Sequence, residues 1–484
     1  MPQNEDYLSR RHERREAARK KREAEAKRVK RTLFAAVLAL VLCGVAFHNL
    51  TKDVVKEKPE KLQSQSQEKV PETTVPPTEA PKPTTPAQKD PITTIHIKAA
   101  GDLNITNATV SAGLSATGYD FTRSFMDVSH VLSDADITVL NFEGNVCGEP
   151  YGGETTSAPK EILVGLRNAG VDMVQTANSR SVQNGFIGLT STLNAIRDAG
   201  LEPMGSYATP EEFQKAKGYT ICDVQGVKVA FVAFTKGFLG MGLPTGSENC
   251  VNLLYEDYAT NYDIVDKARI NSILKSIAAE EPDITIAMLH WGSENNDVVS
   301  PTQKSIVTLM QKGGVDVILG SHSHTLQHID YDPLKGTLVA YSLGDFFGDA
   351  KRGATNYSII LDMEITKDAD TGVTKVTDYT YTPIYTVTEN ESPDGFRRVV
   401  RIEKAVEAYT ANYLDKVTSS CKAGMDKALG RIVERLAVPT EVKCPDCRRE
   451  HELLVNSKKN GLVTSKTCKC GKEFTVGSSI REYE

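Results

Sequence analysis

The chain has 484 residues, of which 40% are hydrophobic and 25% charged, and its formal net charge is −6 at pH 7. This length exceeds that of one compact domain, so two or three domains are expected. The modest negative charge does not favour a nucleic-acid partner, and we expect none. Charge is unevenly distributed, however, because Arg and Lys are concentrated in residues 1–31.

Residues 1–50 have the pattern of a single membrane anchor. The basic segment 1–31 precedes an apolar run, and residues 32–50 reach the roughly 17–25 residues that a membrane-spanning helix needs. This order places the N-terminus in the cytoplasm and the main domain outside the cell membrane. A cleaved signal peptide is the main alternative, but the basic segment is long and no small-x-small cleavage site follows. A basic helix on nucleic acid is another, against which the adjoining apolar run argues.

Residues 51–91 are expected to form a disordered linker. They are rich in Pro, Thr, Lys, Glu and Gln and contain almost no large apolar residues. Such a composition cannot bury enough apolar surface to fold, and its prolines favour an extended chain. The linker would hold a globular domain away from the membrane.

Residues 92–395 alternate strand-like and helix-like segments, which predicts an α/β domain with a central sheet. The helix-like runs include residues 121–133 and 188–200, the second with leucines on one face and Gly200 as its stop. The expected strands are residues 95–100, 137–141, 171–177, 227–234, 284–289, 315–319, 337–341, 357–365 and 376–387.

Polar residues recur where these strands end: Asp102, Glu143, Asn178, His290, His322 and His324. Open α/β sheets bind ligands in the crevice beyond the carboxyl ends of their strands. Because side chains alternate with period two, His322 and His324 are expected on one side of the chain. Imidazole suits a metal ion, so the pattern predicts a metal site at this edge of the sheet.

Seven short stretches, in order, resemble the bacterial capsule synthesis (poly-γ-glutamate biosynthesis) protein family across about residues 94–390. They are Ala-Gly-Asp-Leu (100–103), Asn-Phe-Glu-Gly (141–144), Thr-Ala-Asn (176–178), the run 188–200, His-Trp-Gly-Ser-Glu (290–294), Gly-Ser-His-Ser-His (320–324) and Tyr-Ser-Leu-Gly (341–344). The resemblance implies a calcineurin-like metallophosphoesterase fold, a four-layer αββα sandwich.

By the same resemblance, five residues fall where the fold presents metal ligands: Asp102, Glu143, His290, His322 and His324. Mixed carboxylate and imidazole ligands suit Zn, Mn or Fe better than Mg or Ca. Two ions about 3.5–4 Å apart could bridge a hydroxide and bind a phosphoryl group. One ion, or none, is the alternative.

The chain departs from the family after the third strand, where the family usually reads Asn-Asn-His and this chain reads Asn178-Ser179-Arg180. Ser179 replaces an amide ligand of active relatives, and Arg180 replaces a histidine that would act on the leaving group. Arginine binds phosphate or carboxylate but cannot serve as a general acid near neutral pH. Asp345 also stands where Asn is common. We therefore expect Arg180, Asn178 and Glu294 to surround the reaction site of an enzyme that is weak or silent.

Each site residue also has a structural alternative. The three histidines could be hydrogen-bonded without a metal, and Asp102 could cap a turn. Glu143 could form a buried pair with Arg180. Asn178 could be a turn residue, and Glu294 could orient a ligand histidine or simply be exposed.

Two further segments follow the α/β domain. Residues 396–438 are helical in pattern, and residues 439–484 contain Cys444, Cys447, Cys468 and Cys470. Two close cysteine pairs on either side of a hairpin-sized insert predict a zinc-ribbon-like module with a structural Zn. Outside the membrane, the same cysteines could instead form two disulfides.

Three functions follow from these observations. The first is a membrane-anchored accessory protein in the synthesis or export of a capsule or poly-γ-glutamate-like polymer. Its partners would be membrane synthase or export subunits and the anionic polymer itself. The second is a metal-dependent hydrolase of phosphoester or polymer amide bonds. The third is a non-catalytic scaffold or binding protein with a degenerate site.

Overall fold

A computed structural model describes residues 91–474 apart from residues 414–415, 445, 448–449 and 456–465. The predicted basic segment, the anchor at residues 32–50 and nearly all of the predicted linker lie outside the described residues. In the part that the structure describes, no helix is both long enough and apolar enough to cross a bilayer.

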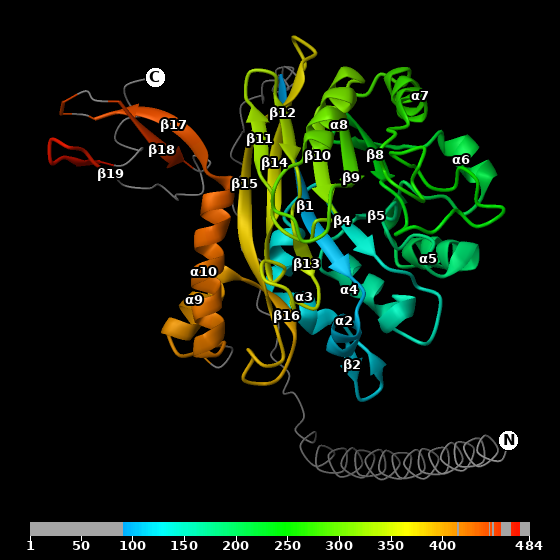
Figure 1. The fold of residues 1–484 in the computed structure, drawn as a ribbon, viewed down its shortest axis with the longest axis horizontal. Helices are drawn as coiled ribbons and strands as arrows, with labels where there is room; N and C mark the ends of the chain where they lie inside the picture. The colour runs from blue at the N-terminus through cyan, green and yellow to red at the C-terminus, as the bar shows by residue number, and fades with distance from the viewer. Residues whose placement is uncertain (1–90, 414–415, 445, 448–449, 456–465, 475–484) are drawn as a thin grey trace, which may run out of the picture. The chain divides into compact units, whose positions relative to one another are not determined.

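The first sheet has eight strands in the order β16-β15-β14-β1-β4-β5-β6, with β13 also paired to β1 (Figure 1). Strands β1, β4, β5 and β6 are parallel, whereas β14, β15 and β16 continue the sheet in antiparallel pairs. Their bounds are β1 Ile92–Asn104, β4 Ile137–Glu143, β5 Met173–Gln175, β6 Glu202–Met204, β13 Asp345–Phe347, β14 Tyr357–Asp368, β15 Thr374–Val387 and β16 Arg398–Arg401.

The second sheet has six strands in the order β11-β12-β10-β9-β8-β7. Strands β8, β9, β10 and β12 are parallel, and β7 and β11 are antiparallel edge strands. Their bounds are β7 Thr220–Val224, β8 Val227–Thr235, β9 Ile284–His290, β10 Val317–Ser321, β11 Ile329–Asp332 and β12 Thr337–Ala340.

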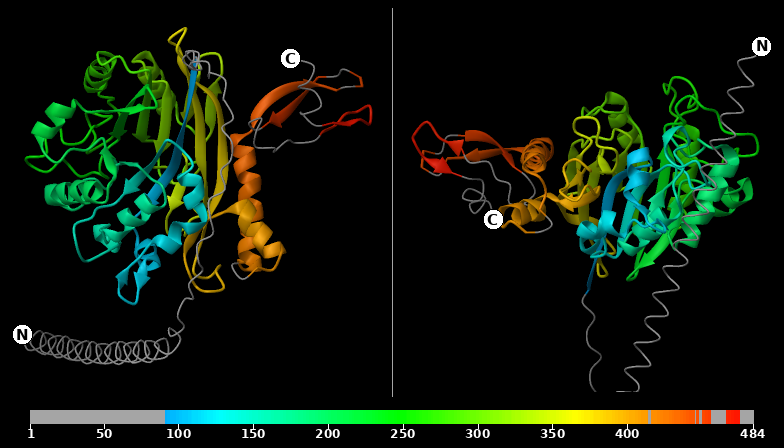
Figure 2. Two further views of the ribbon diagram at one scale, coloured as in Figure 1. Left: turned by 180° about the vertical axis from the view of Figure 1, so that it is seen from behind. Right: turned by 90° about the horizontal axis from the view of Figure 1, so that it is seen from below.

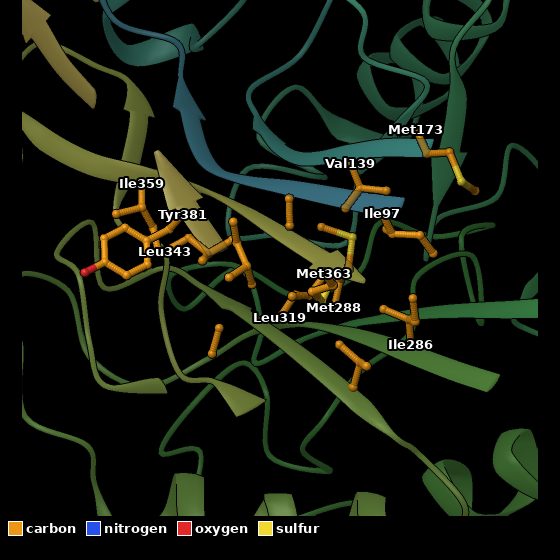
Figure 3. Close-up of a cluster of buried hydrophobic side chains, with 14 of the residues drawn as sticks. Ile97, Val139, Met173, Ile286, Met288, Leu319, Leu343, Ile359, Met363 and Tyr381 are labelled. Atoms are coloured by element: carbon orange, nitrogen blue, oxygen red, sulfur yellow. The ribbon is translucent and has the colours of Figure 1, made fainter. Parts of the chain in front are cut away.

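Alternating side chains give each sheet two apolar faces, which creates four layers. Ile97 and Val139 of the first sheet pack with Ile286 and Leu319 of the second in the central core (Figure 3). The opposite face of the first sheet packs on α3 (Thr122–Leu132) and α4 (Glu161–Asn168). The opposite face of the second sheet packs on α7 (Lys267–Ala278) and α8 (Pro301–Lys312). The expected αββα arrangement is confirmed.

The local sequence explains where these elements begin. Helix α8 starts at a capping box in which Ser300 and Gln303 exchange hydrogen bonds, with Pro301 at the first helical position. The two predicted helices are confirmed as α3 and as α5 (Gly185–Asp198), and all nine predicted strands are present. Shorter elements are α2 Asn107–Ala112, β2 Leu114–Ser115, β3 Gly118–Tyr119, η1 Gly153–Thr155 and α6 Pro210–Ala216.

The segment expected to be helical from residue 396 differs at its start. Residues Arg398–Arg401 form β16, because Val399 and Val400 alternate between the two faces of the first sheet. Helices α9 (Ile402–Thr410) and α10 (Ser419–Leu436) follow, and α10 lies beside β15 and β14 (Figure 2). Met425 and Ile432 of α10 are buried in the central core, so this helix belongs to the α/β body.

The C-terminal residues form two short hairpins. Strand β17 (Val438–Lys443) pairs with β18 (Glu450–Val455), and β19 (Lys466–Thr467) pairs with β20 (Glu473–Phe474). Cys444 and Cys447 lie between β17 and β18, and Cys468 and Cys470 lie between β19 and β20, so each hairpin carries one cysteine pair at its turn.

Candidate metal centre

The predicted ligands meet where strands of the two sheets end. Asp102 lies in β1 and Glu143 is the last residue of β4, so the first sheet supplies the carboxylates. His290 is the last residue of β9, and His322 and His324 directly follow β10, so the second sheet supplies the imidazoles. The centre therefore exists only because the two sheets pack face to face.

The side chains form two potential ligand groups. One consists of Glu143, His290 and His322, and the other of Asp102, Glu143 and His324, each with ligand atoms within 4.8 Å of one another. Glu143 belongs to both groups. A carboxylate shared between two neighbouring sites is suited to bridge a pair of divalent ions.

Burial around Glu143 shows that these residues fit a cation. Its Oε2 atom is buried and has no hydrogen-bond partner among the residues that the structure describes, and Oε1 lies 3.8 Å from His290 Nε2. Burial raises the pKa of Glu143 to about 8, because little solvent stabilises its charge. A buried carboxylate oxygen without a donor is costly unless a cation balances it.

The two histidines after β10 do not continue the strand. His322 and His324 have φ values of 87° and 58°, which are rare for residues other than glycine. The two rings lie on one side of the chain as expected, with centroids 6.2 Å apart, but the turn after Ser321 and not strand alternation places them there. The turn directs His322 and His324 to different ligand groups. Such strained backbone is typical of binding and catalytic sites.

The environments of the three imidazoles differ. Burial lowers the pKa of both His290 and His322 well below the ordinary value, which keeps them neutral and able to bind a metal. Burial has the same effect on His324, but the charge of Asp345 and hydrogen bonds to Asp102 and Asp345 outweigh it and raise the pKa of His324 well above 6.5. The Nδ1 atom of His324 lies 2.9 Å from Asp345 Oδ1.

Asp102 is held in place by backbone and side-chain contacts. Its N–H donates to the carbonyl of Gly344 (2.8 Å), and its Oδ1 accepts from Asn141 Nδ2 (2.7 Å). The approach of β1 to Gly344 requires glycine at position 101, where a Cβ atom would lie 1.8 Å from the Gly344 oxygen. Asp102 Oδ2 accepts from the His322 N–H (3.1 Å), which ties the two sheets together. This fixed position argues against a turn-capping role.

Ser179 lies inside the centre, although the sequence indicated only that it replaces an amide ligand of the family. Its Oγ is 2.9 Å from His290 Nε2 and 3.3 Å from His322 Nδ1. Asn178 instead braces the backbone, since its Nδ2 donates to the Phe142 carbonyl at 2.7 Å. The Ser179 hydroxyl therefore lies beside the two imidazoles, whereas Asn178 hydrogen-bonds to the backbone at the end of β4.

Arg180 and Glu294 lie around the centre rather than in it. Arg180 is half-buried and donates from Nη1 to Gln183 Oε1 (3.2 Å). Among the described residues, no ion pair joins Arg180 to Glu143, so the structure does not contain the buried pair considered as an alternative. Glu294 is exposed in the segment after β9.

Two residues at the centre were not among the predicted site residues. Asp345 is buried, and its Oδ1 accepts from Asn104 Nδ2 (2.8 Å) as well as contacting His324. Burial raises the pKa of Asp345 to about 6. Strand alternation could have found Asn104, two residues after Asp102. Asp345 could not be found in this way, because only the pairing of β13 with β1 places it opposite Asp102.

The C-terminal cysteines form a second donor cluster. The Sγ atoms of Cys444 and Cys470 are 3.6 Å apart, and those of Cys447 and Cys468 are 3.4 Å apart. All four lie within 4.8 Å of one another, and the structure places none of these four in a disulfide. Tetrahedral Zn with Zn–S bonds of about 2.3 Å places sulfur atoms roughly 3.8 Å apart, so this cluster could bind zinc.

The remaining described cysteines are also free: Cys147, Cys222, Cys250 and Cys421.

Comparison with known proteins identifies the α/β body. Residues 96–350 match the model of the bacterial capsule synthesis protein family PGA_cap. The chain is 28% identical to the capsule biosynthesis protein CapA of Bacillus anthracis over 265 residues, which cover 52% of this chain and 60% of that protein. It is 25% identical to the PGA biosynthesis protein CapA of Bacillus subtilis, covering 52% and 63%. The match thus spans less than two thirds of these relatives.

Among solved structures, the calcineurin-like phosphoesterase YfkN of Bacillus subtilis is similar in fold, with a TM-score of 0.37 and 18% identity over 60% of this chain and 91% of that one. A phosphatase from Mycoplasma pneumoniae gives the same TM-score with 14% identity, over 60% of this chain and 94% of that one. The family match covers more than half of the chain, and its ends lie within the α/β body. The chain belongs to the bacterial capsule synthesis protein family PGA_cap.

Proposed function

We propose that this protein is an accessory component in the synthesis or export of an anionic cell-surface polymer of the capsule or poly-γ-glutamate type. Residues 32–50 would anchor it in the cell membrane, with the N-terminus in the cytoplasm and the α/β body outside. Its partners would be membrane synthase or export subunits and the polymer. The family match and the two ligand groups that share Glu143 support this proposal.

The centre would hold one or two divalent ions of Zn, Mn or Fe. When bound, such ions supply Lewis acidity and can activate water. Asp102, Glu143, His290, His322 and His324 would hold them, with Asp345 orienting His324 and Asn141 orienting Asp102. Mixed imidazole and carboxylate donors favour these metals over Mg and Ca.

Hydrolysis of a phosphoester or of a polymer amide bond is the second candidate function. The shared position of Glu143 favours it, because the two ligand groups would hold two neighbouring divalent ions, which would supply Lewis acidity for hydrolysis. Arg180 and Ser179 oppose it. Arginine does not release a proton near neutral pH, and serine is a weaker ligand than an amide or carboxylate. A body that binds metal and polymer without turnover would serve as a scaffold.

The test is genetic and biochemical in the host cell. Deletion of the gene should abolish or strongly reduce the surface polymer, and the full chain should restore it. A chain with His322→Ala and Asp102→Asn should fail if the centre is needed, whereas Lys427→Ala, an exposed change on α10, should restore the polymer fully. Detergent-solubilised full chain should co-purify with membrane synthase subunits. Normal polymer in the deletion strain would contradict the proposal.

The cellular location has its own test. Protease added to intact cells stripped of their wall should digest the body of the full chain and spare a tag at the N-terminus. Release of the protein from washed membranes by salt alone would contradict the anchor at residues 32–50.

We also propose that the cluster of Cys444, Cys447, Cys468 and Cys470 binds a structural zinc ion. The Cys470→Ser variant should then carry one zinc per chain fewer than the original chain, and a chelator should expose the four thiols of the cluster. Cys421→Ser is the matched control, because this buried thiol lies in α10 outside the cluster. Two disulfides found by mass spectrometry without reduction would overturn the zinc assignment.

A further inference from the structure

Lys236 directly follows β8 at the sheet edge that carries the metal-type histidines. Thr235, the last residue of β8, pairs with His290 in register, and the Lys236 N–H donates to the His290 carbonyl at 2.8 Å. The Nζ atom donates to the carbonyl of Gly292 at 2.7 Å. Lys236 is therefore tied to the segment that leads out of His290, at both its backbone and its ammonium group.

The lysine is held in place and not freely solvated. Its Nζ lies 4.4 Å from the centre of the Tyr262 ring, in the range of a cation–π contact. A glycine at position 237 allows this packing, because a Cβ atom there would lie 2.2 Å from the Tyr258 oxygen and 2.8 Å from the Tyr262 ring. Burial lowers the pKa of Lys236, because desolvation disfavours the charged ammonium group, and the charge of Glu294 opposes this effect.

Arg180 brings a second cation to the same place from the other sheet. It follows β5, is half-buried, and its N–H donates to Asn178 Oδ1 at 3.0 Å. Ser179, the residue before Arg180, contacts both His290 and His322 through its Oγ. Lys236 and Arg180 therefore both lie near the ligand group of His290 and His322.

Two fixed cations beside a metal centre require a negative partner. If both ligand groups hold divalent ions, the carboxylates of Asp102, Glu143 and Asp345, together with that of Glu294 near Lys236, do not neutralise those ions and the two side-chain cations. An excess of positive charge at a partly buried site is unfavourable unless an anion binds there. Lysine and arginine both form strong charge-assisted hydrogen bonds to carboxylate and phosphate oxygens.

We propose that Lys236 and Arg180 bind an oxyanion group of an acidic ligand beside the metal centre, with Lys236 as a residue that determines ligand specificity. This inference rests on the proposed function and deepens it, because it assigns the ligand to the class of carboxylate- or phosphate-bearing molecules. The residues that hold the metal and those that hold the ligand are then separate sets.

The test measures anion binding to the metal-loaded full chain by calorimetry at low and high salt. The probes are inorganic phosphate and a short γ-linked glutamate oligomer. Lys236→Met should weaken binding about tenfold and reduce its salt dependence, because one charge-assisted contact is lost. Lys236→Arg should retain most of the affinity. Metal content should stay unchanged, since Lys236 is not a ligand.

Lys228→Met is the matched control, because Lys228 lies at the other end of β8 and its Nζ donates to the Glu280 carbonyl. It should bind both probes like the original chain. Lys236→Met could lower the unfolding temperature more than this control does. In that case Arg180→Met and Lys236→Arg replace it in the test: Arg180→Met should weaken anion binding, and Lys236→Arg should not.

The outcomes separate this inference from the proposed function. Equal binding by the original chain and Lys236→Met, with normal metal content, would show that Lys236 only connects Gly292 and Tyr262, and would overturn the inference alone. Binding of phosphate but not of the glutamate oligomer would keep the anion site and favour the hydrolase over the polymer-binding protein. If the metal-loaded chain binds neither probe, the inference is wrong, whereas the proposed function is contradicted only if the deletion strain makes normal polymer.

Discussion

Glu143 belongs to both ligand groups, and its buried Oε2 has no partner among the described protein atoms. The buried carboxylate favours metal binding but destabilises the metal-free fold. Without a metal, the carboxylate is a buried charge that burial disfavours. With a metal, the same oxygen becomes a ligand. The residue is thus placed for binding at a cost in stability.

Replacement of Glu143 by Gln should separate these two effects. The amide keeps the shape but loses the charge. Metal affinity should therefore fall on the order of 100-fold, which is the upper end of the loss seen when residues that only orient metal ligands are mutated. The metal-free variant should unfold at the same or a higher temperature than the metal-free original. Metal analysis after dialysis and thermal unfolding with a chelator measure both quantities. Glu256→Gln, an exposed change, is the control and should alter neither. Full metal content in Glu143→Gln would contradict the assignment.

Ser179 is the residue whose replacement should strengthen the centre. Its hydroxyl contacts His290 and His322, so an amide at this position can reach an ion bound between them. We expect Ser179→Asn to tighten metal binding about tenfold, since one more oxygen ligand is supplied. Competition with a metal indicator measures the change, and Ser179→Ala is the matched control that should not bind more tightly. Equal affinities for Asn and Ala would show that position 179 does not contact the metal.

Among the secondary-structure elements, helix α10 shows that the folded body extends beyond the region matched by the family model. The match ends at residue 350, but α10 supplies Met425 and Ile432 to the central core. Arg435 of this helix forms an ion pair with Asp297 and also donates to the Asp297 carbonyl at 3.0 Å. The segment after β9 is thereby held by a helix that lies outside the family region.

Truncation of a buried α10 side chain should therefore destabilise the whole body. Ile432→Ala should lower the free energy of unfolding by about 2–5 kcal/mol, because it leaves a cavity in a fully buried position. Lys427→Ala, on the exposed face of the same helix, should change it by less than about 0.5 kcal/mol. Urea unfolding followed by tryptophan fluorescence reports on the body. If both variants are equally stable, α10 is not part of the core.

The contact of His328 with α10 should make stability depend on pH. His328 Nε2 lies 3.1 Å from Asp330 Oδ1, and its Nδ1 lies 3.3 Å from the Arg435 carbonyl. The hydrogen bond to Asp330 raises the pKa of His328, and the bond to His328 lowers the pKa of Asp330. The contribution of His328 to the free energy of unfolding is complete below the pKa of about 6.5 that histidine has in the unfolded chain. It is lost as pH rises through the higher pKa of His328 in the folded state. The contribution of Asp330 is present above the ordinary aspartate pKa of about 3.9 and is lost as pH falls through its lower pKa in the folded state.

His328→Gln should accordingly lower the free energy of unfolding more at pH 5.5 than at pH 9. The difference should be at most about 1 kcal/mol, because both side chains of the pair are partly exposed and solvent screens them. Denaturant unfolding at both pH values measures it, and Asp330→Asn should show the same sign. A larger loss at pH 9 than at pH 5.5 would exclude the protonated pair.

At the scale of the molecule, the candidate centre joins two sheets. Asp102, Glu143 and Asp345 come from the first sheet, and the three histidines come from the second. An ion bound by both sets would cross-link the two halves of the α/β body at one edge of the central core. Metal should therefore stabilise the fold as a whole and not one loop.

Metal removal should lower the unfolding temperature of the body. Free metal at 100 times its dissociation constant should stabilise the fold by about 2.7 kcal/mol, if the unfolded chain does not bind it. The measurement uses a Cys444→Ser and Cys470→Ser background, so that the thiol cluster does not contribute. The same titration with Glu143→Gln added should give little shift. An unfolding temperature that does not depend on metal would show that the two sheets are not linked in this way.

The sequence alone was sufficient for the strands and the two helices that it predicted in the α/β domain. The nine predicted strands, helices α3 and α5 and the five metal-type ligands depend on apolar periodicity and on polar residues at strand ends, which neighbouring residues determine. The family resemblance rests on the same local stretches. The four cysteines could also be recognised from their spacing, but not whether they pair with each other or surround one ion.

Only the tertiary structure decided which of these residues act together. The pairing of β13 with β1 brings Asp345 to His324, and the turn after β10 divides His322 and His324 between two groups. Ser179 became a site residue, and Lys236 a neighbour of His290, through contacts between strands far apart in the chain. The physical reason is that periodicity specifies the face on which a side chain lies. The packing of one sheet on the other determines what that face meets.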